Sequence, residues 1–179
     1  MDYGIAIVPP EDLWCRIKEI QDRFGNNEIE PHITLKAQGG LGENIKWLEL
    51  VKSIAKQTSP FKIVLGNIRK FGNEVLYISV DSPELIALHN RIIDELNLSP
   101  EIIERYFEKE LFTPHLTLGR TQAGFNQEDF PKMKELTEEM LKGSDTSFEA
   151  EFMRVYSIEK GDCRPKEDIY FVGSINPEL

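Results

Sequence analysis

The chain has 179 residues, 40% of them hydrophobic and 29% charged, and it carries a formal net charge of −10. This composition is typical of a globular protein that forms one domain or two small lobes. The acidic balance argues against a protein that binds long nucleic acid, because such binding depends on Lys and Arg neutralising phosphates. Any phosphate substrate should be small or should meet a locally basic site.

Three further features of the sequence indicate where in the cell the protein is expected to act. No segment approaches the roughly 18 apolar residues that a membrane-spanning helix needs. The apolar run before Pro9-Pro10 lacks the basic lead and the length of a signal peptide. Cys15 and Cys163 stand outside any CxxC pattern, so they indicate neither a zinc site nor redox chemistry. We expect a cytoplasmic protein with two reduced thiols.

In the first half of the chain, hydrophobic periodicity predicts alternating strands and helices. Residues 3–8 form an apolar run typical of a buried strand. A helix is expected to open at Pro10 and end at Gly25. The following predicted elements are a strand over residues 32–35, an amphipathic helix over 43–56 and a strand over 61–68.

The second half repeats this order. Residues 75–80 predict a strand, and Asp81-Ser82-Pro83-Glu84 combines a capping residue, an early proline and an acid, which indicates a helix start. The remaining predicted elements are a short helix from Ser99-Pro100, a strand over 115–118, a helix over 126–141 and strands over 148–158 and 169–172. The recurrence indicates an ancient duplication, with halves of approximately 1–73 and 74–179 in one compact domain of residues 1–179.

One five-residue motif occurs in both halves. Residues 31–35 read Pro-His-Ile-Thr-Leu, and residues 114–118 read Pro-His-Leu-Thr-Leu, so the two histidines lie 83 residues apart (115 − 32). Side chains of a strand alternate between its faces. His32 and Thr34 should therefore share one face, and His115 and Thr117 should share one face of their own strand. Each copy presents an imidazole beside a hydroxyl, with aliphatic residues behind them.

This pairing suits proton transfer at a phosphate. Histidine titrates near neutrality, so one imidazole can accept a proton from an attacking hydroxyl while the other protonates the leaving oxygen. The hydroxyls of Thr34 and Thr117 can donate hydrogen bonds to non-bridging phosphate oxygens. The scheme requires no metal and no cofactor. Two alternatives are two unrelated structural histidines and a metal site, but no third ligand candidate accompanies either strand.

The paired motifs resemble the signature of the 2H phosphoesterase superfamily, which carries two His-x-Thr-x motifs about half a chain apart. The resemblance covers essentially the whole chain and is greatest to the small bacterial YjcG-type branch. It implies a bilobal α+β fold with pseudo-twofold symmetry, in which two antiparallel sheets flank a central cleft and helices lie outside. It also implies that His32, Thr34, His115 and Thr117 line the cleft, with His32 as proton donor and His115 as proton acceptor.

Three more residues are candidates for substrate binding. Lys36 continues the face of His32 and Thr34, and Arg120 would share the face of His115 if the strand persists through Gly119. Either would bring positive charge to a phosphate. Tyr156, on a late strand, offers a ring on which a base could stack. For each, the alternative is an ordinary solvated or sheet-packing side chain. His89 lies on the third helix without a motif, and we interpret it as a partly buried helix residue.

The sequence therefore predicts a metal-independent phosphoesterase that acts on a 2′,3′-cyclic or 2′-5′-linked phosphate of a nucleotide or short oligonucleotide. Two other functions stay open: a non-catalytic nucleotide-binding module, and a 2′-5′ RNA ligase or RNA end-processing protein. The expected partner is a small nucleotide or a short RNA end, without extended nucleic acid and without a membrane. The oligomeric state is left open.

Overall fold

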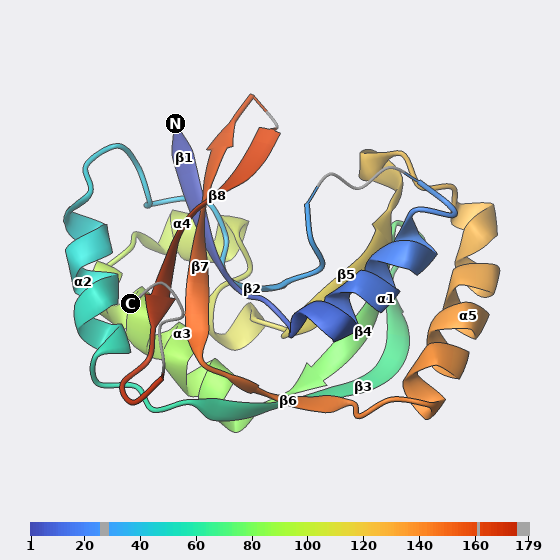
Figure 1. Ribbon diagram of the computed structural model, residues 1–179. Helices are drawn as coiled ribbons and strands as arrows, with labels where there is room; N and C mark the ends of the chain where they lie inside the picture. The colour runs from blue at the N-terminus through green and yellow to red at the C-terminus, as the bar shows by residue number, and fades with distance from the viewer. Residues whose placement is uncertain (26–28, 161, 175–179) are drawn as a thin grey trace.

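The computed structural model describes residues 1–25, 29–160 and 162–174, and over these residues it is a mixed α and β protein (Figure 1). The strands are β1 (Asp2–Ile7), β2 (Ile33–Lys36), β3 (Phe61–Phe71), β4 (Val75–Asp81), β5 (His115–Arg120), β6 (Ser147–Ala150), β7 (Phe152–Glu159) and β8 (Asp162–Tyr170). The α-helices are α1 (Glu11–Gln21), α2 (Lys46–Ala55), α3 (Pro83–Leu96), α4 (Pro100–Arg105) and α5 (Phe130–Lys142).

The strands form one continuous antiparallel sheet in the order β6-β3-β4-β5-β2-β1-β7-β8. Two separate sheets were expected. Instead the two motif strands, β2 and β5, pair with each other at Ile33 and Leu116 and join the two four-stranded halves. The sheet is strongly curled, as Figure 1 shows. The motif strands therefore lie at the centre of the sheet.

The C-terminal strands differ from the predicted ones. The single strand expected over residues 148–158 is interrupted at Glu151: β6 pairs with β3, and β7 pairs with β1 in the other half of the sheet. The last strand, β8, begins earlier than expected and includes Pro165. A proline, which lacks an N–H, is tolerated there because β8 is an edge strand and its register with β7 shifts between Val155 and Tyr156.

The helices lie in two groups, with α1 and α5 at one side of the molecule and α2, α3 and α4 at the other (Figure 1). Helix α3 begins where the sequence predicted, and the Ser82 hydroxyl accepts a hydrogen bond from the backbone N–H of Leu85 at 3.3 Å. The helices and the sheet enclose a core that includes Ile5, Ile33, Ile78 and Leu116. Among the described residues, every helix is too short or too polar to cross a membrane.

The two motif strands have the same register with their outer neighbours. In the β1–β2 pair, Ile5, Ala6 and Ile7 lie opposite Lys36, Thr34 and Ile33. In the β4–β5 pair, Leu76, Tyr77 and Ile78 lie opposite Gly119, Thr117 and Leu116. Each pair contains a β-bulge directly after the motif threonine, because Leu35 and Leu118 have no partner in this register. An internal duplication would produce this match.

Candidate active site

The register between β2 and β5 gathers the four motif side chains. Because the strands run antiparallel and Ile33 lies opposite Leu116, His32 falls across from Thr117, and Thr34 across from His115. Such cross-strand neighbours share one face of the sheet, and diagonal neighbours lie roughly 7–8 Å apart. All four side chains are half-buried. A protonated His115 lowers the pKa of His32, which reflects their proximity.

The two imidazoles are held in the same way. The Nδ1 atom of His32 lies 2.9 Å from the carbonyl oxygen of Glu30, and Nδ1 of His115 lies 2.7 Å from the carbonyl oxygen of Thr113. A carbonyl oxygen only accepts hydrogen bonds, so Nδ1 carries the proton in each neutral ring. That leaves Nε2 of each ring as the atom that accepts a proton, or donates one when the ring is charged.

The rings differ in what surrounds them. The His115 ring meets Phe71 and Tyr77 edge-on, with ring centroids 5.0 and 5.3 Å away. The His32 ring packs against Tyr156 at 5.6 Å. Burial lowers the pKa of both histidines below its ordinary value, because a charged imidazolium loses hydration. Both rings are therefore biased toward the neutral form.

Arg120 reaches the face of His115 through a β-bulge. The sequence prediction assumed that a strand continuing through Gly119 would give this result, but in a regular strand the odd spacing of five residues would place Arg120 on the opposite face. Because Leu76 pairs with Gly119 while Tyr77 pairs with Thr117, Leu118 and Gly119 both face the core. A Cβ on Gly119 would lie only 2.9 Å from the Phe125 ring. The bulge returns Arg120 to the open face, where its charge lowers the pKa of both His32 and His115.

The corresponding bulge in β2 turns Lys36 the other way. Regular alternation predicts that Lys36 shares the face of Thr34, but the register shift between Ile5 and Ala6 makes Leu35 and Lys36 both face the core. Lys36 therefore occupies the position that Gly119 has in β5. Its side chain is fully buried, with an exposed fraction of 0%.

The ammonium group of Lys36 is fully engaged in the core. It donates hydrogen bonds to the carbonyl oxygens of Ala37 (2.6 Å) and Gly39 (3.0 Å) and to the Glu108 carboxylate (2.7 Å). An ammonium has three N–H donors, so none is left for a phosphate. The prediction that Lys36 binds substrate is therefore wrong. Through its ion pair with Glu108, Lys36 connects β2 to the segment that precedes β5.

His89 belongs to the same buried cluster. Its Nδ1 lies 2.7 Å from the Leu35 carbonyl oxygen, and its Nε2 accepts a hydrogen bond from the backbone N–H of Lys109 at 3.0 Å. Its ring stacks on Phe112 with centroids 3.7 Å apart. Burial lowers the pKa of His89 to about 4, so the ring is neutral. His89 was predicted to be a partly buried helix residue, but its side chain is fully buried.

Tyr156 lies beside His32 but is not an open surface for stacking. Its side chain is buried, and its hydroxyl donates a hydrogen bond to Glu30 Oε1 at 2.7 Å. The predicted stacking of a base on Tyr156 is not supported, because the ring packs against His32 instead. Sequence reasoning passed over Glu30 and Phe71, which both lie next to a motif histidine. Glu30 stands two residues before His32, and that closeness was the one available signal.

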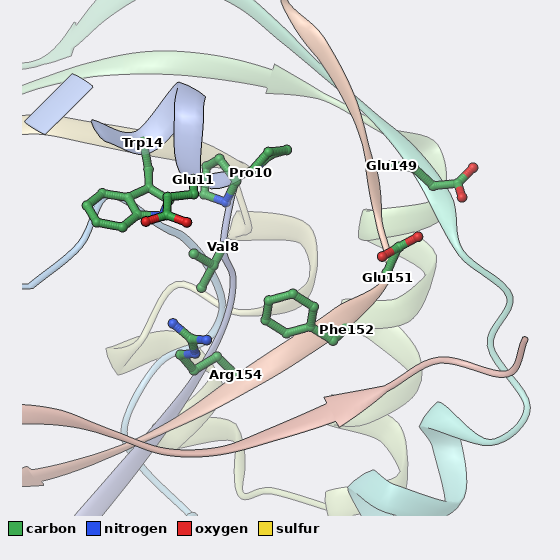
Figure 2. A pocket seen from close by; sticks show the side chains of 9 residues that line it. Val8, Pro10, Glu11, Trp14, Glu149, Glu151, Phe152 and Arg154 are labelled. Carbon is green, nitrogen blue, oxygen red and sulfur yellow. The ribbon is translucent and has the colours of Figure 1, made fainter. Parts of the chain in front are cut away.

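A separate cavity of about 470 Å³ lies between the start of α1 and the β6–β7 segment, as Figure 2 shows. It is lined by Val8, Pro9, Pro10, Glu11, Trp14, Glu149, Glu151, Phe152 and Arg154. The one cation in this lining, Arg154, already binds the carboxylates of Asp168 and Glu30. Three carboxylates beside an engaged arginine would repel a phosphate. We therefore place the candidate phosphate site at the motif histidines and not in this cavity.

Comparisons with known proteins identify the family of the chain and its fold. The sequence model of the 2′-5′ RNA ligase superfamily matches residues 9–124, a segment that contains both motifs. No curated protein sequence matches the chain. Among solved structures, TT0787 of Thermus thermophilus has a similar fold, with a TM-score of 0.71 at 16% identity over 98% of this chain and 100% of that chain.

Two structures of E. coli LigT are also similar. The complex with ATP has a TM-score of 0.60 at 18% identity, and the complex with 3′-AMP has a TM-score of 0.60 at 16% identity. Each match covers 96% of this chain and 98% of the LigT chain. At such low identity these likenesses show a shared fold.

Proposed function

This chain belongs to the 2′-5′ RNA ligase superfamily of 2H phosphoesterases, and on that premise we propose that it is a metal-independent cyclic phosphodiesterase. Its substrate would be a 2′,3′-cyclic or 2′-5′-linked phosphate of a nucleotide or short oligonucleotide. The observation that carries the proposal is the placement of His32, Thr34, His115 and Thr117 on one face of the sheet, with both Nε2 atoms free of the backbone contacts that hold Nδ1.

The proposed reaction balances without a further reagent. Nε2 of neutral His115 accepts a proton from a water molecule as its oxygen attacks the phosphorus of the cyclic phosphate. The bond from phosphorus to one ribose oxygen breaks, and Nε2 of protonated His32 donates a proton to that oxygen. Thr34, Thr117 and Arg120 stabilise the charge that builds on the non-bridging oxygens. The product is a phosphomonoester, and each histidine ends in the other's starting state.

Phe71 supports a substrate that carries a nucleobase. It lies at the end of β3 and is 38% exposed, which is unusual for an aromatic ring. Its ring stacks on Tyr77 with centroids 4.1 Å apart, and it makes a T-shaped contact with the His115 ring. The sheet register places Phe71 opposite Val75, and Val75 opposite Arg120. An exposed ring beside the phosphate site is what a base needs for stacking.

Replacing Phe71 with alanine is expected to raise KM for a nucleotide substrate by about 5- to 150-fold, because stacking on an aromatic ring contributes roughly 1–3 kcal/mol per base. Phe71→Trp should keep KM close to that of the wild type. The matched control is Phe107→Ala, since Phe107 is also exposed, at 68%, but lies outside the site. Steady-state kinetics would measure both. Equal KM values for F71A, F107A and the wild type would rule out the stacking role.

The proposed function itself is tested by a substrate screen. Purified protein would be incubated with 2′,3′-cyclic mononucleotides and 2′-5′ dinucleotides, with and without EDTA, and the products separated by chromatography. We expect turnover that the chelator leaves unchanged. Loss of turnover in EDTA, restored by a divalent metal, would contradict the metal-independent mechanism. The assignment of the chain to the YjcG-type branch stays a prediction. Identification of the preferred substrate would help to test it.

A binding module is the second candidate, because similar structures were solved with nucleotides: LigT with ATP and with 3′-AMP. Calorimetry with 2′,3′-cyclic nucleotides separates the two functions, since tight binding without product after long incubation would favour the module. Ligation of RNA ends would instead show steep salt dependence and a footprint of more than a few nucleotides. The net charge of −10 opposes such extended contact.

A further inference from the structure

The two histidines have matching backbone contacts but different charged neighbours. Glu30, whose carbonyl oxygen accepts from His32 Nδ1, also acts on His32 with its carboxylate, and this negative charge raises the pKa of His32. Over the described residues, the charge that acts on the pKa of His115 is the positive one of Arg120. Among the residues that the structure describes, the motif symmetry is thus broken electrostatically, because a negative charge acts on the pKa of His32 and a positive charge acts on that of His115.

The Glu30 carboxylate is held by residues of β7. Its Oε1 accepts hydrogen bonds from Arg154 Nη1 at 2.8 Å and from the Tyr156 hydroxyl at 2.7 Å. Arg154 is itself fixed by a bidentate pair with Asp168 of β8, with both N–O distances at 2.6 Å. Bidentate arginine–carboxylate pairs of this kind are among the most directional contacts in proteins. The chain of contacts runs from Asp168 through Arg154 to Glu30 and so to His32.

Small residues on β1 pair with the two β7 residues that hold Glu30. Ala6 lies opposite both Thr34 and Arg154, and Gly4 lies opposite Tyr156. Arg154 and Tyr156, which pair with these small residues, both donate hydrogen bonds to Glu30. In the β4–β5 pair the position of Ala6 is taken by Tyr77, whose ring instead fills the space beside His115. The difference between Ala6 in the first half and Tyr77 in the second thus accompanies the different surroundings of His32 and His115.

We propose that Glu30 is a positioning residue that orients His32 and favours its protonated form, and that Arg154, Tyr156 and Asp168 hold Glu30 for this role. The consequence of this inference for catalysis rests on the proposed function. In the hydrolytic direction, His32 would be the proton donor and His115 would be the base. The family resemblance implies these same roles, and the Glu30 network supplies a physical reason for them in this chain.

The charges around His32 act in opposite directions. Burial lowers its pKa most, and Arg120 and His115 lower it further, whereas the hydrogen bond to the Glu30 carbonyl and the Glu30 carboxylate raise it. Partial burial would raise the pKa of Glu30, but the hydrogen bonds from Tyr156 and Arg154 outweigh this and lower it. Glu30 is therefore ionised near neutral pH. Removing its charge should lower the pKa of His32.

Glu30→Gln tests the inference, because the amide oxygen of Gln can still accept from Arg154 and Tyr156 while the charge is lost. The chain has three histidines, so their Hε1 resonances can be followed by NMR over a pH titration, with H32A and H115A used for assignment. We expect the His32 midpoint to fall by about one pH unit in E30Q. The His115 midpoint should stay unchanged, and Glu30→Asp should restore most of the His32 value.

The control is Glu135→Gln, which removes an exposed ion pair with Lys132 on α5 and should shift neither midpoint. Kinetics add a second readout: the high-pH limb of kcat/KM should move in E30Q by the same amount as the His32 midpoint. An unchanged His32 midpoint in E30Q, or equal shifts of His32 and His115, would overturn the positioning role. Because the titration needs no substrate, an active H32A variant would refute the proposed function and leave this result standing.

Discussion

Replacing His32 or His115 with alanine is expected to lower kcat on a validated cyclic phosphate by about 10²- to 10⁴-fold, the usual contribution of a general acid or base. The double variant should lose little more than either single variant, because two groups that act in one concerted transfer are not additive. Thermal unfolding and circular dichroism would confirm that each variant folds. Both side chains are half-buried on one sheet face, so their truncation leaves the core intact.

The pH dependence belongs to the same prediction. Base catalysis by His115 needs its neutral form and is lost as the pH falls through its pKa; acid catalysis by His32 needs its charged form and is lost as the pH rises through its own. The pKa of each is lowered from the ordinary 6.5 by burial. Both limbs of the bell-shaped rate profile should therefore lie on the acidic side of about pH 6.5. Wild-type values of kcat in both H32A and H115A would contradict the proposed mechanism.

Glu108→Gln is expected to destabilise the fold by about 3–5 kcal/mol, because it leaves the buried ammonium of Lys36 without its counter-ion. The pair is almost inaccessible, with side chains 0% and 2% exposed. Burial lowers the pKa of Lys36 and raises that of Glu108, and their ion pair opposes both changes. Urea unfolding would measure the loss as a lower midpoint at constant slope.

Two comparisons make this stability result specific. Replacing both partners, with Lys36→Met and Glu108→Leu, should recover most of the lost stability, since an apolar pair removes the uncompensated charge. Glu135→Gln, which breaks the exposed pair with Lys132, should cost no more than about 1 kcal/mol. A single variant E108Q as stable as E135Q would contradict the assignment of Lys36 to the core.

The position of Lys36 also has a consequence for activity. It lies at the end of β2, two residues after Thr34, and Glu108 belongs to the segment that leads to β5 and His115. The pair therefore connects the chain near both motif strands. We expect E108Q to lose activity in parallel with its loss of folded protein, in contrast to H32A, which should lose activity while fully folded.

Much of the site was determined by local sequence. The doubled Pro-His-x-Thr-Leu motif, read with the two-residue period of a strand, predicts that each histidine shares a face with its threonine, because side-chain alternation is a property of the backbone itself. The start of α3 at Pro83 follows equally from Ser82 and its capping hydrogen bond. These features depend on neighbours within a few residues, so the sequence by itself determined them.

Only the tertiary structure decided which charges reach the histidines. Alternation assigned Lys36 to the open face, but a bulge set by pairing with β1 turned it into the core, and the corresponding bulge in β5 brought Arg120 out. Glu30 and Arg154 meet although 124 residues separate them. The two bulges result from how each motif strand pairs with its neighbour, and the residue pattern of one strand does not show where its pairing shifts. The sequence therefore determined the groups that we propose as catalytic, and the folded sheet determined their electrostatic surroundings.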